Sequence, residues 1–501
     1  MTPPRSDVSK SYTQIIKSTT LIGGSSIINV MFSILRNKAM ALLLGPEGIG
    51  MIALYNSIVD MSQTVAGLGI NASGVRQIAA VNTEDTARVS EVVAVLRRVS
   101  LLLGIIGTTL LFVLAAPVAQ FTFGDSRHTL GVMALSLAVF FQVAAGARTA
   151  LLQGMRDISS IAWIGVLAGL FSVIVGVPII YCLGETGIAI SLVVAAFVNF
   201  VASWWFSRRI HLPRPSLSLR RALLEASDLC KLGLVFMASA FLSMGSTYAI
   251  RLIVSSESGL HAAGLYQAAW SLGGLYAGFI LQAMGTDFYP RLTAVSEDNA
   301  ECNRLVNEQT EISILLAGPG LIATMTLAPA FMALLYSSEF QGAVEILRWI
   351  CLGMMLRIVA WPMGFIVLAK GVKSIFFWSE IAAAVVQVGL AWLCVQKFGA
   401  AGAGLAFFGL YVWHSVLMYF IARHFTDFRW SPVNRNLINA YLAISALLFG
   451  ALQLLPLWQA TTLGLAIAAL AGLHSLRNLA DLVPEHALPR LIRPLLNMCR
   501  I

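Results

Sequence analysis

Apolar segments of about 20 residues recur along almost the whole chain. A helix needs about 20 such residues to cross the hydrocarbon core of a bilayer. The connections between the segments are short and turn-like, as in LGPEG (44–48), LGETG (183–187) and SESG (256–259). Only 11% of the residues are charged, against about 25% in soluble domains. The sequence therefore predicts an all-α polytopic membrane protein.

The apolar segments predict about fourteen transmembrane helices. Their approximate limits are 14–44, 48–75, 92–116, 130–153, 159–182, 187–207, 231–254, 260–289, 309–335, 342–369, 374–396, 401–422, 437–455 and 459–478.

Lysine and arginine are distributed very unequally between the two sides of these predicted spans. The side that holds the N-terminus carries 25 of them, whereas the opposite loops carry only Arg127 and Lys397. Under the positive-inside rule this asymmetry predicts that both termini are cytoplasmic. The net charge of +9 is then mostly a topology signal, so it does not call for a nucleic-acid partner.

The chain also resembles itself at an offset of about 215 residues. GIGMIALYNS (48–57) resembles AAGLYQAAWS (262–271), and LGETGIA (183–189) resembles FGAAGAG (398–404). Six spans per repeat would give both copies the same orientation, related by an axis along the membrane normal.

The repeat predicts four parts in the chain. They are an N-lobe of six spans (1–207), a basic cytoplasmic linker (208–230), a C-lobe of six spans (231–425), and a last part with two further helices and a cytoplasmic tail (426–501).

Besides the basic residues counted for the two sides, six lie inside the predicted spans: Arg36, Lys38, Arg148, Arg251, Arg348 and Arg357. A cation at that depth costs about 2.5–3.5 kcal/mol on insertion scales. The repeat places Arg36 and Arg251 at equivalent depth, where two arginines on opposite walls would clamp a phosphate or carboxylate. Asn29 shares a helix face with Arg36. Arg357 lies in mid-span, too deep to reach the membrane surface easily.

Asp60 and Glu380 are the acidic residues that lie farthest from the ends of their predicted spans. Asp60 shares a face with Asn56, Gln63 and Gly67, and Glu380 lies on the eleventh predicted helix. Such carboxylates can carry a coupling proton or sodium ion. Alternatively, buried pairs such as Asp60 with Arg36 simply lock helices together. Because the in-span cations outnumber the acids six to two, a hydrated anion-binding cavity is favoured for the set as a whole.

Motifs of enzyme chemistry are absent from the sequence. There is no Walker A motif, no H-E-x-x-H and no nucleotide-binding glycine fingerprint after a strand. The six cysteines are scattered and form no C-x-x-C pair, and His414 and His424 have no clustered ligand partners. We therefore expect no catalytic residue, no metal site and no cofactor beyond a coupling ion.

Three stretches carry a resemblance to a known family: LLLGPEGIGMIALYNSIVD (42–60), IRLIVSSESGLHAAGLYQAAWSLGGL (250–275) and YSSEFQGAVEILRWICLGMMLRIVAWPMGFIVLAKG (336–371). With them the chain resembles the Wzx-type O-antigen and lipid III flippases of the multidrug/oligosaccharidyl-lipid/polysaccharide exporter superfamily. The resemblance covers about residues 12–425, and the two additional C-terminal helices depart from the common twelve spans of the family.

The resemblance implies a multi-pass protein of the bacterial inner membrane, whose two lobes form a V around a cationic cavity. It would turn undecaprenyl-pyrophosphate-linked oligosaccharide, a precursor of surface polysaccharide, from the cytoplasmic to the periplasmic leaflet by alternating access. The candidate substrate-binding residues are Arg36, Arg251, Arg357, Arg148 and Asn29. Asp60 and Glu380 are the candidate ion-coupling residues. A polysaccharide polymerase and a chain-length regulator would be neighbouring proteins.

Two other functions stay open. A drug or cation antiporter of the same superfamily would favour acids and aromatic residues over six in-span cations. A membrane-embedded polymerase or ligase would carry its catalytic residues in a large outer loop, whereas the longest outer loop here (about 117–129) holds only Asp125, Arg127 and His128 as charged or titratable groups.

Overall fold

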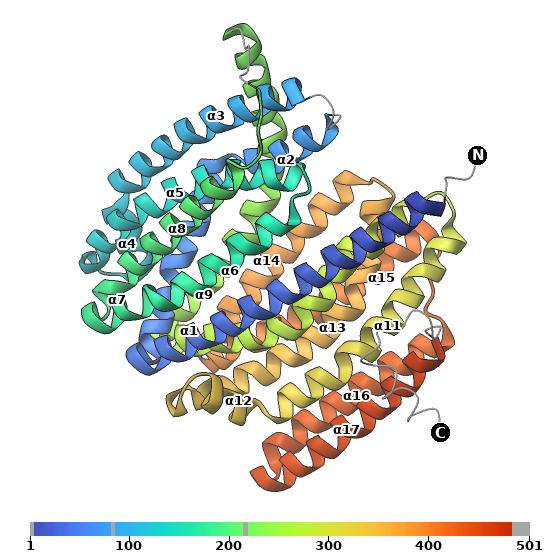
Figure 1. Ribbon diagram of the computed structural model, residues 1–501. Helices are drawn as coiled ribbons and strands as arrows, with labels where there is room; N and C mark the ends of the chain where they lie inside the picture. Colours follow the sequence, from blue (N-terminus) through green and yellow to red (C-terminus); the bar gives the residue numbers. More distant parts are fainter. Residues whose placement is uncertain (1–4, 82–85, 214–218, 483–501) are drawn as a thin grey trace. The chain divides into compact units, whose positions relative to one another are not determined.

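The computed structural model describes residues 5–81, 86–213 and 219–482, and within these ranges every regular element is a helix (Figure 1). This confirms the predicted all-α class. The chain divides between Leu252 and Ile253, inside a long helix, into two compact units. We call them the N-terminal unit and the C-terminal unit. The predicted linker (208–230) lies partly outside the described residues, and the predicted lobe limits stay predictions.

The N-terminal unit holds ten helices in the described ranges, counting the short helix η1 and the first part of α9. They are α1 (Arg5–Gly67), α2 (Ile70–Ala80), α3 (Thr86–Val113), α4 (Ala115–Phe123), η1 (Ser126–His128), α5 (Thr129–Gly154), α6 (Ile158–Ile174), α7 (Gly176–Leu183) and α8 (Thr186–Ser207), followed by α9 (Leu219–Ala283) as far as Leu252.

The C-terminal unit begins within α9. It continues with η2 (Met284–Phe288), α10 (Tyr289–Ala294), α11 (Asn299–Thr326), α12 (Ala328–Leu335), η3 (Ser338–Gly342), α13 (Ala343–Ala369), α14 (Lys373–Phe398), α15 (Ala401–Thr426), α16 (Pro432–Leu454) and α17 (Leu457–Leu482).

Two of the longest helices each contain a glycine at which the helical conformation breaks. Gly45 in α1 (φ 64°, ψ −167°) and Gly259 in α9 (φ 87°, ψ 169°) have positive φ angles that favour glycine. Pro46 follows Gly45 and has no N–H to continue the hydrogen-bonded ladder. The turns expected at LGPEG and SESG are therefore present at these breaks.

Within the described residues, ten helices are long and apolar enough to cross a membrane, and two further bent pairs (α3 with α4, α11 with α12) raise the number to twelve. Two of the ten, Ile28–Gly67 and Ala222–Leu275, have 40 and 54 residues and contain the breaks at Gly45 and Gly259. Because about 20 residues suffice for one crossing, each of them is long enough for two. The described residues thus hold ten to twelve candidate spans, and the expected number of about fourteen crossings stays a prediction.

One helix forms the centre of the C-terminal unit. In α13, 72% of the most apolar window is buried, against 11% in α14. The close approach of α13 to α15 depends on small residues, since a Cβ atom on Gly353 would lie 2.5 Å from the Phe407 ring. In the N-terminal unit α5 packs against α3 and α8.

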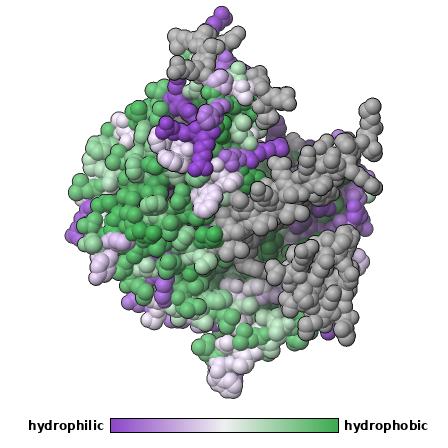
Figure 2. All heavy atoms as spheres, in the orientation of Figure 1, coloured by the Kyte–Doolittle hydropathy of each residue, from purple (hydrophilic) through white to green (hydrophobic). Residues whose placement is uncertain are grey.

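Large apolar side chains remain at the surface of many helices, for example Leu130, Leu447 and Leu454. Figure 2 shows broad apolar areas on the face in view. Such a surface suits contact with lipid tails rather than with water.

Candidate functional site

The N-terminal unit contains a pocket of about 370 Å³ between α1, α2, α3, α5 and α9. We call it the polar pocket for the polar side chains on its other walls, although α9 contributes only apolar ones. Asp60, Gln63 and Gly67 line it from α1, as the predicted helix face requires, while Asn56 lies outside the lining. The other helices contribute the polar side chains of Asn71, Ser100 and Gln142. Amide and hydroxyl groups both donate and accept hydrogen bonds, and a carboxylate accepts them, so these groups suit a hydroxyl-rich ligand or a cation.

Arg251 is held against α1 one turn before the polar pocket. Its Nη1 donates to Ser57 Oγ at 2.6 Å and to the carbonyl oxygen of Ala53 at 3.3 Å. Its charge also acts on Asp60. Arg36 and Lys38, on the first part of α1, are half-buried. That Arg36 and Arg251 form an anion clamp stays a prediction.

Asn29 lies at the contact between α1 and α6. A Cβ atom on Gly165 would come within 2.8 Å of Asn29 Nδ2, and one on Gly169 within 3.3 Å of its Oδ1. The Oδ1 atom is buried and has no hydrogen-bond partner among the described residues. Asn29 therefore packs on the small residues of α6, and its predicted role in substrate binding stays a prediction.

Arg148 on α5 lies against an aromatic ring. Its Cζ is 4.5 Å from the centre of the Phe200 ring, and its Nη1 donates to the carbonyl oxygen of Ala144 in the preceding turn. The charge of Arg97 on α3 acts on it as well. In the described part of the chain neither arginine forms an ion pair. Arg97 was not among the predicted site residues, because it counts with the cytoplasmic cations in the sequence.

The C-terminal unit places Arg357 between two aromatic side chains. Its Cζ lies 4.7 Å from the ring centre of Trp361, one turn along α13, and 5.7 Å from that of Tyr411 on α15. Its charge acts on Glu380 of α14 and on His414 of α15. The structure thus brings together two predicted residues, Arg357 and Glu380.

Tyr411 and His414 are members of this cluster that the sequence did not reveal. Both are largely buried, and their ring centres are 5.7 Å apart. With Phe407 they occupy one face of α15 at spacings of four and three residues. This spacing could have predicted that the three side chains share a helix face, but it could not have predicted that Arg357 lies beside them.

Arg348 has a different role from that of the other in-span cations. It is 7% exposed and donates to the carbonyl oxygens of Met325 at 3.5 Å and Leu452 at 3.4 Å. These carbonyls belong to the last turns of α11 and α16. A cation near such C-terminal carbonyl groups is favourable, so Arg348 joins the ends of two helices.

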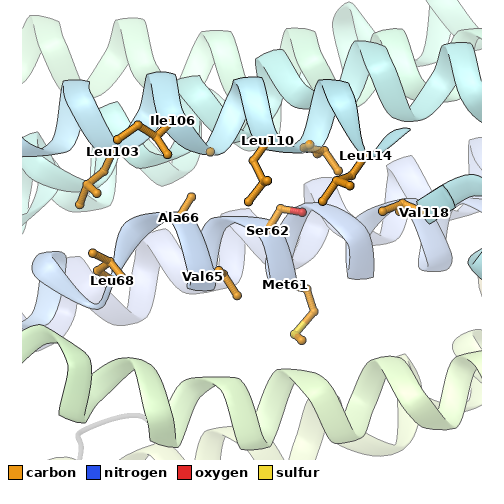
Figure 3. A pocket seen from close by; sticks show the side chains of 12 residues that line it. Met61, Ser62, Val65, Ala66, Leu68, Leu103, Ile106, Leu110, Leu114 and Val118 are labelled. Carbon is orange, nitrogen blue, oxygen red and sulfur yellow. The ribbon is translucent and has the colours of Figure 1, made fainter. Parts of the chain in front are cut away.

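An apolar trough runs along the N-terminal unit between α1, α3 and α4 (Figure 3). Its main part has a volume of about 330 Å³, and an adjoining cavity of about 320 Å³ shares four lining residues with it. The shared residues are Met61, Ser62, Leu114 and Val118. Among the residues that line the main part, only Ser62 has a polar side chain.

A family profile described as "Polysaccharide biosynthesis protein" matches residues 39–345, more than half of the 501 residues. The chain belongs to this family. Among curated proteins, it is 21% identical to the lipid III flippase of Escherichia coli K12 over 400 residues (79% of this chain, 95% of the relative). It is 23% identical to the succinoglycan biosynthesis transport protein ExoT of Rhizobium meliloti over 375 residues (71% and 72%).

Solved structures match the fold. The lipid II flippase MurJ in an inward closed conformation has a TM-score of 0.69 at 12% identity, covering 93% of this chain and 100% of that one. An inward-facing MATE multidrug transporter of the MOP superfamily has a TM-score of 0.66 at 16% identity, covering 80% and 94%. This family member therefore has the fold that these structures share, as predicted. The family match and the curated relatives confirm the predicted resemblance and the prediction of a transporter rather than an enzyme.

Proposed function

We propose that the chain is a flippase that moves undecaprenyl-pyrophosphate-linked oligosaccharide from the cytoplasmic to the periplasmic leaflet of the bacterial inner membrane by alternating access. Both termini would be cytoplasmic. The family and the likeness to the lipid III flippase support the substrate class. A polysaccharide polymerase and a chain-length regulator are expected neighbours on the same grounds.

The observation that carries the proposal is the setting of Arg357. Aromatic rings lie against its guanidinium group, which stabilises a desolvated cation by roughly 2 kcal/mol. Within the described part of the chain, Arg357 has no hydrogen bond or ion pair with another residue. Its Nε is buried without a partner, and the N–H donors of its two Nη atoms are left for the oxygen atoms of a pyrophosphate, which arginine binds in a bidentate manner.

The other predicted residues have supporting roles in this proposal. Arg36, Arg251, Arg148 and Asn29 would contact the pyrophosphate or the sugars as the lipid head group moves. Arg251 is already fixed on α1 by Ser57, so it would bind without much loss of side-chain entropy. Asp60 in the polar pocket and Glu380 beside Arg357 would carry a coupling proton or sodium ion.

Complementation of a flippase-null strain tests the proposal. Arg357→Ala should abolish surface glycan and let lipid-linked oligosaccharide accumulate, whereas Arg357→Lys should restore part of the activity because it keeps the charge but not the bidentate geometry. Arg304→Ala is the matched control, since Arg304 forms an exposed ion-pair network with Glu301 and Glu308. Full glycan with correctly inserted Arg357→Ala would contradict the proposal.

The coupling residues need their own test. Asp60→Asn and Glu380→Gln should each change the dependence of flipping on external pH or sodium, because they remove a carboxylate without changing its size. Unchanged flipping and unchanged ion dependence in both variants would rule out their role as coupling residues.

A cation or drug antiporter is the second candidate, and Asp60 at the wall of the polar pocket is the observation in its favour. The two functions differ in one measurement. An antiporter would lower the accumulation of cationic drugs in cells in an Asp60-dependent manner, and a flippase would not.

A further inference from the structure

The stretch of α1 from Asp60 to Leu68 separates two cavities of different character, one with a mixed polar and apolar lining and one with an almost entirely apolar lining. Asp60, Gln63 and Thr64 line the polar pocket, whereas Met61 and Val65 line the apolar trough. Residues three and four apart share a helix face, so this single stretch presents a polar face to one cavity and an apolar face to the other. Both cavities lie entirely within the N-terminal unit.

The trough is long, narrow and almost free of polar groups. It follows α1 from Ile58 to Leu68, which corresponds to about 15 Å of helix. Figure 3 shows side chains of α3, among them Leu103 and Leu110, pointing toward α1. At its floor the two helices touch, since a Cβ atom on Gly107 would lie 2.3 Å from the Cβ of Ala66. This shape suits one extended hydrocarbon chain.

The trough and the polar pocket approach each other where α1 ends. Leu68 lines the trough, and its neighbours Gly67 and Gly69 line the pocket. On α3, Ser100 lines the pocket and Leu103, one turn away, lines the trough. Leu68 and Gly69 both have positive φ angles (46° and 62°), so the helix turns away at this point. A molecule with a polar head and an apolar chain could occupy both cavities here.

We propose that the trough holds the polyprenyl chain of the lipid-linked substrate while the head group lies at the polar pocket, in a state before the pyrophosphate reaches Arg357. This proposal rests on the flippase function proposed above and adds to it the path of the chain. Bilayer tails are as apolar as leucine, so the trough gains little from the hydrophobic effect. It acts instead through its shape, by fixing the direction of the chain while the head group crosses.

The depth of the polar pocket selects the substrate over an ordinary phospholipid as the occupant. Ser100 lies eight residues inside the predicted span 92–116, and Gln142 lies near the middle of the predicted span 130–153, which places them about 12 Å and 17 Å from the nearer ends of these spans. A resident phospholipid keeps its head group at the membrane surface. A lipid whose polar head lies at the depth of Ser100 is one in transit.

Photo-crosslinking tests the occupant with a matched pair of positions on α3. Ile106 lines the trough and is 60% exposed, and Leu102, one turn away, lies outside the trough lining and is 62% exposed. The full-length protein carries p-benzoylphenylalanine in place of either residue, in vesicles of phosphatidylethanolamine and phosphatidylglycerol that contain tritiated undecaprenyl pyrophosphate.

We expect several-fold more tritium on the protein labelled at position 106 than at position 102. Unlabelled undecaprenyl pyrophosphate should compete, and additional phosphatidylglycerol should not. Equal labelling at the two positions would overturn the proposal. Competition by phosphatidylglycerol would overturn it as well, because acyl chains would then occupy the trough.

A transport experiment separates this proposal from the flippase function. If the unmodified chain complements a flippase-null strain, Ile106→Trp, which fills the trough, should lower surface glycan several-fold, while Leu102→Trp should not. Equal activity of the two variants would overturn the trough alone. Failure of the unmodified chain to complement would overturn the flippase function, and the crosslinking result would still decide whether the trough binds a prenyl chain.

Discussion

Arg348 and Arg357 lie nine residues apart on α13, and the structure gives them different surroundings. Arg348 donates to carbonyl groups at the ends of α11 and α16. Arg357 lies against Trp361 and Tyr411 and has no hydrogen bond with another described residue. Arg348 donates to carbonyl groups that have no partner within their own helices, whereas the N–H groups of Arg357 donate to no described residue. An arginine at membrane depth is therefore not in itself a sign of a binding site.

Exchange of each arginine for methionine should give opposite results, with the largest effects of the predictions made here. Arg357→Met should lower flipping about tenfold or more, because a hydrogen bond to a charged group is worth about 1.5–3 kcal/mol, and should leave the Tm nearly unchanged. Arg348→Met should lower the free energy of unfolding by about 1–2 kcal/mol, and with it the Tm. The flipping rate per folded molecule should stay unchanged. The rate of flipping in cells measures the activity of each variant, and the Tm in detergent measures its stability.

The different roles of the two arginines would be contradicted if Arg348→Met abolished flipping at an unchanged Tm. They would also be contradicted if Arg357→Met unfolded most of the protein while the fraction that stayed folded retained normal flipping.

Gly353→Ala should have the next largest effect, since Gly353 lies between the two arginines and sets the distance from α13 to α15. The added Cβ atom would overlap the Phe407 ring, and overpacking of this kind typically costs about 1–3 kcal/mol. The shift would also move Tyr411 away from Arg357. We expect a lower Tm together with reduced flipping.

Gly364→Ala is the matched control on the same helix, because its Cβ atom would meet only Met418 Sδ at an ordinary distance of 4.0 Å. Equal Tm values for the two glycine variants would show that α15 can move aside without penalty.

Removal of the aromatic rings around Arg357 should have a smaller effect. Trp361→Leu and Tyr411→Leu should each weaken flipping by a factor of about 2–30, since a cation–π contact contributes roughly 0.5–2 kcal/mol. Tyr411→Phe keeps the ring and should retain most activity. Loss of activity in Tyr411→Phe would assign the function to the hydroxyl group instead, and the initial rate of flipping in vesicles distinguishes these cases.

Much of the fold could be predicted from the sequence because the membrane imposes a simple rule. Every backbone group must be satisfied inside a helix, so apolar length and turn residues such as Gly45 and Gly259 mark the helices closely. The connection between α7 and α8 at Gly184, for example, is the turn that the LGETG stretch predicts.

The surroundings of the charged residues could not be predicted in the same way. Helices that are apolar on all sides carry little signal for which face meets a neighbour. The sequence therefore singled out Arg357 by its depth but not Tyr411 or His414, which come from α15. It also treated Arg348 and Arg357 alike, since the carbonyl partners of Arg348 belong to helices more than 20 residues away on either side.

The most direct test of the account is the equilibrium binding of undecaprenyl pyrophosphate to the purified protein in nanodiscs. The account predicts that Arg357→Gln weakens binding by about tenfold or more, as expected for the loss of a charged hydrogen-bond partner of the pyrophosphate, while Arg304→Ala binds like the unmodified chain. Equal affinity of Arg357→Gln and the unmodified chain would contradict the central claim that Arg357 binds the pyrophosphate.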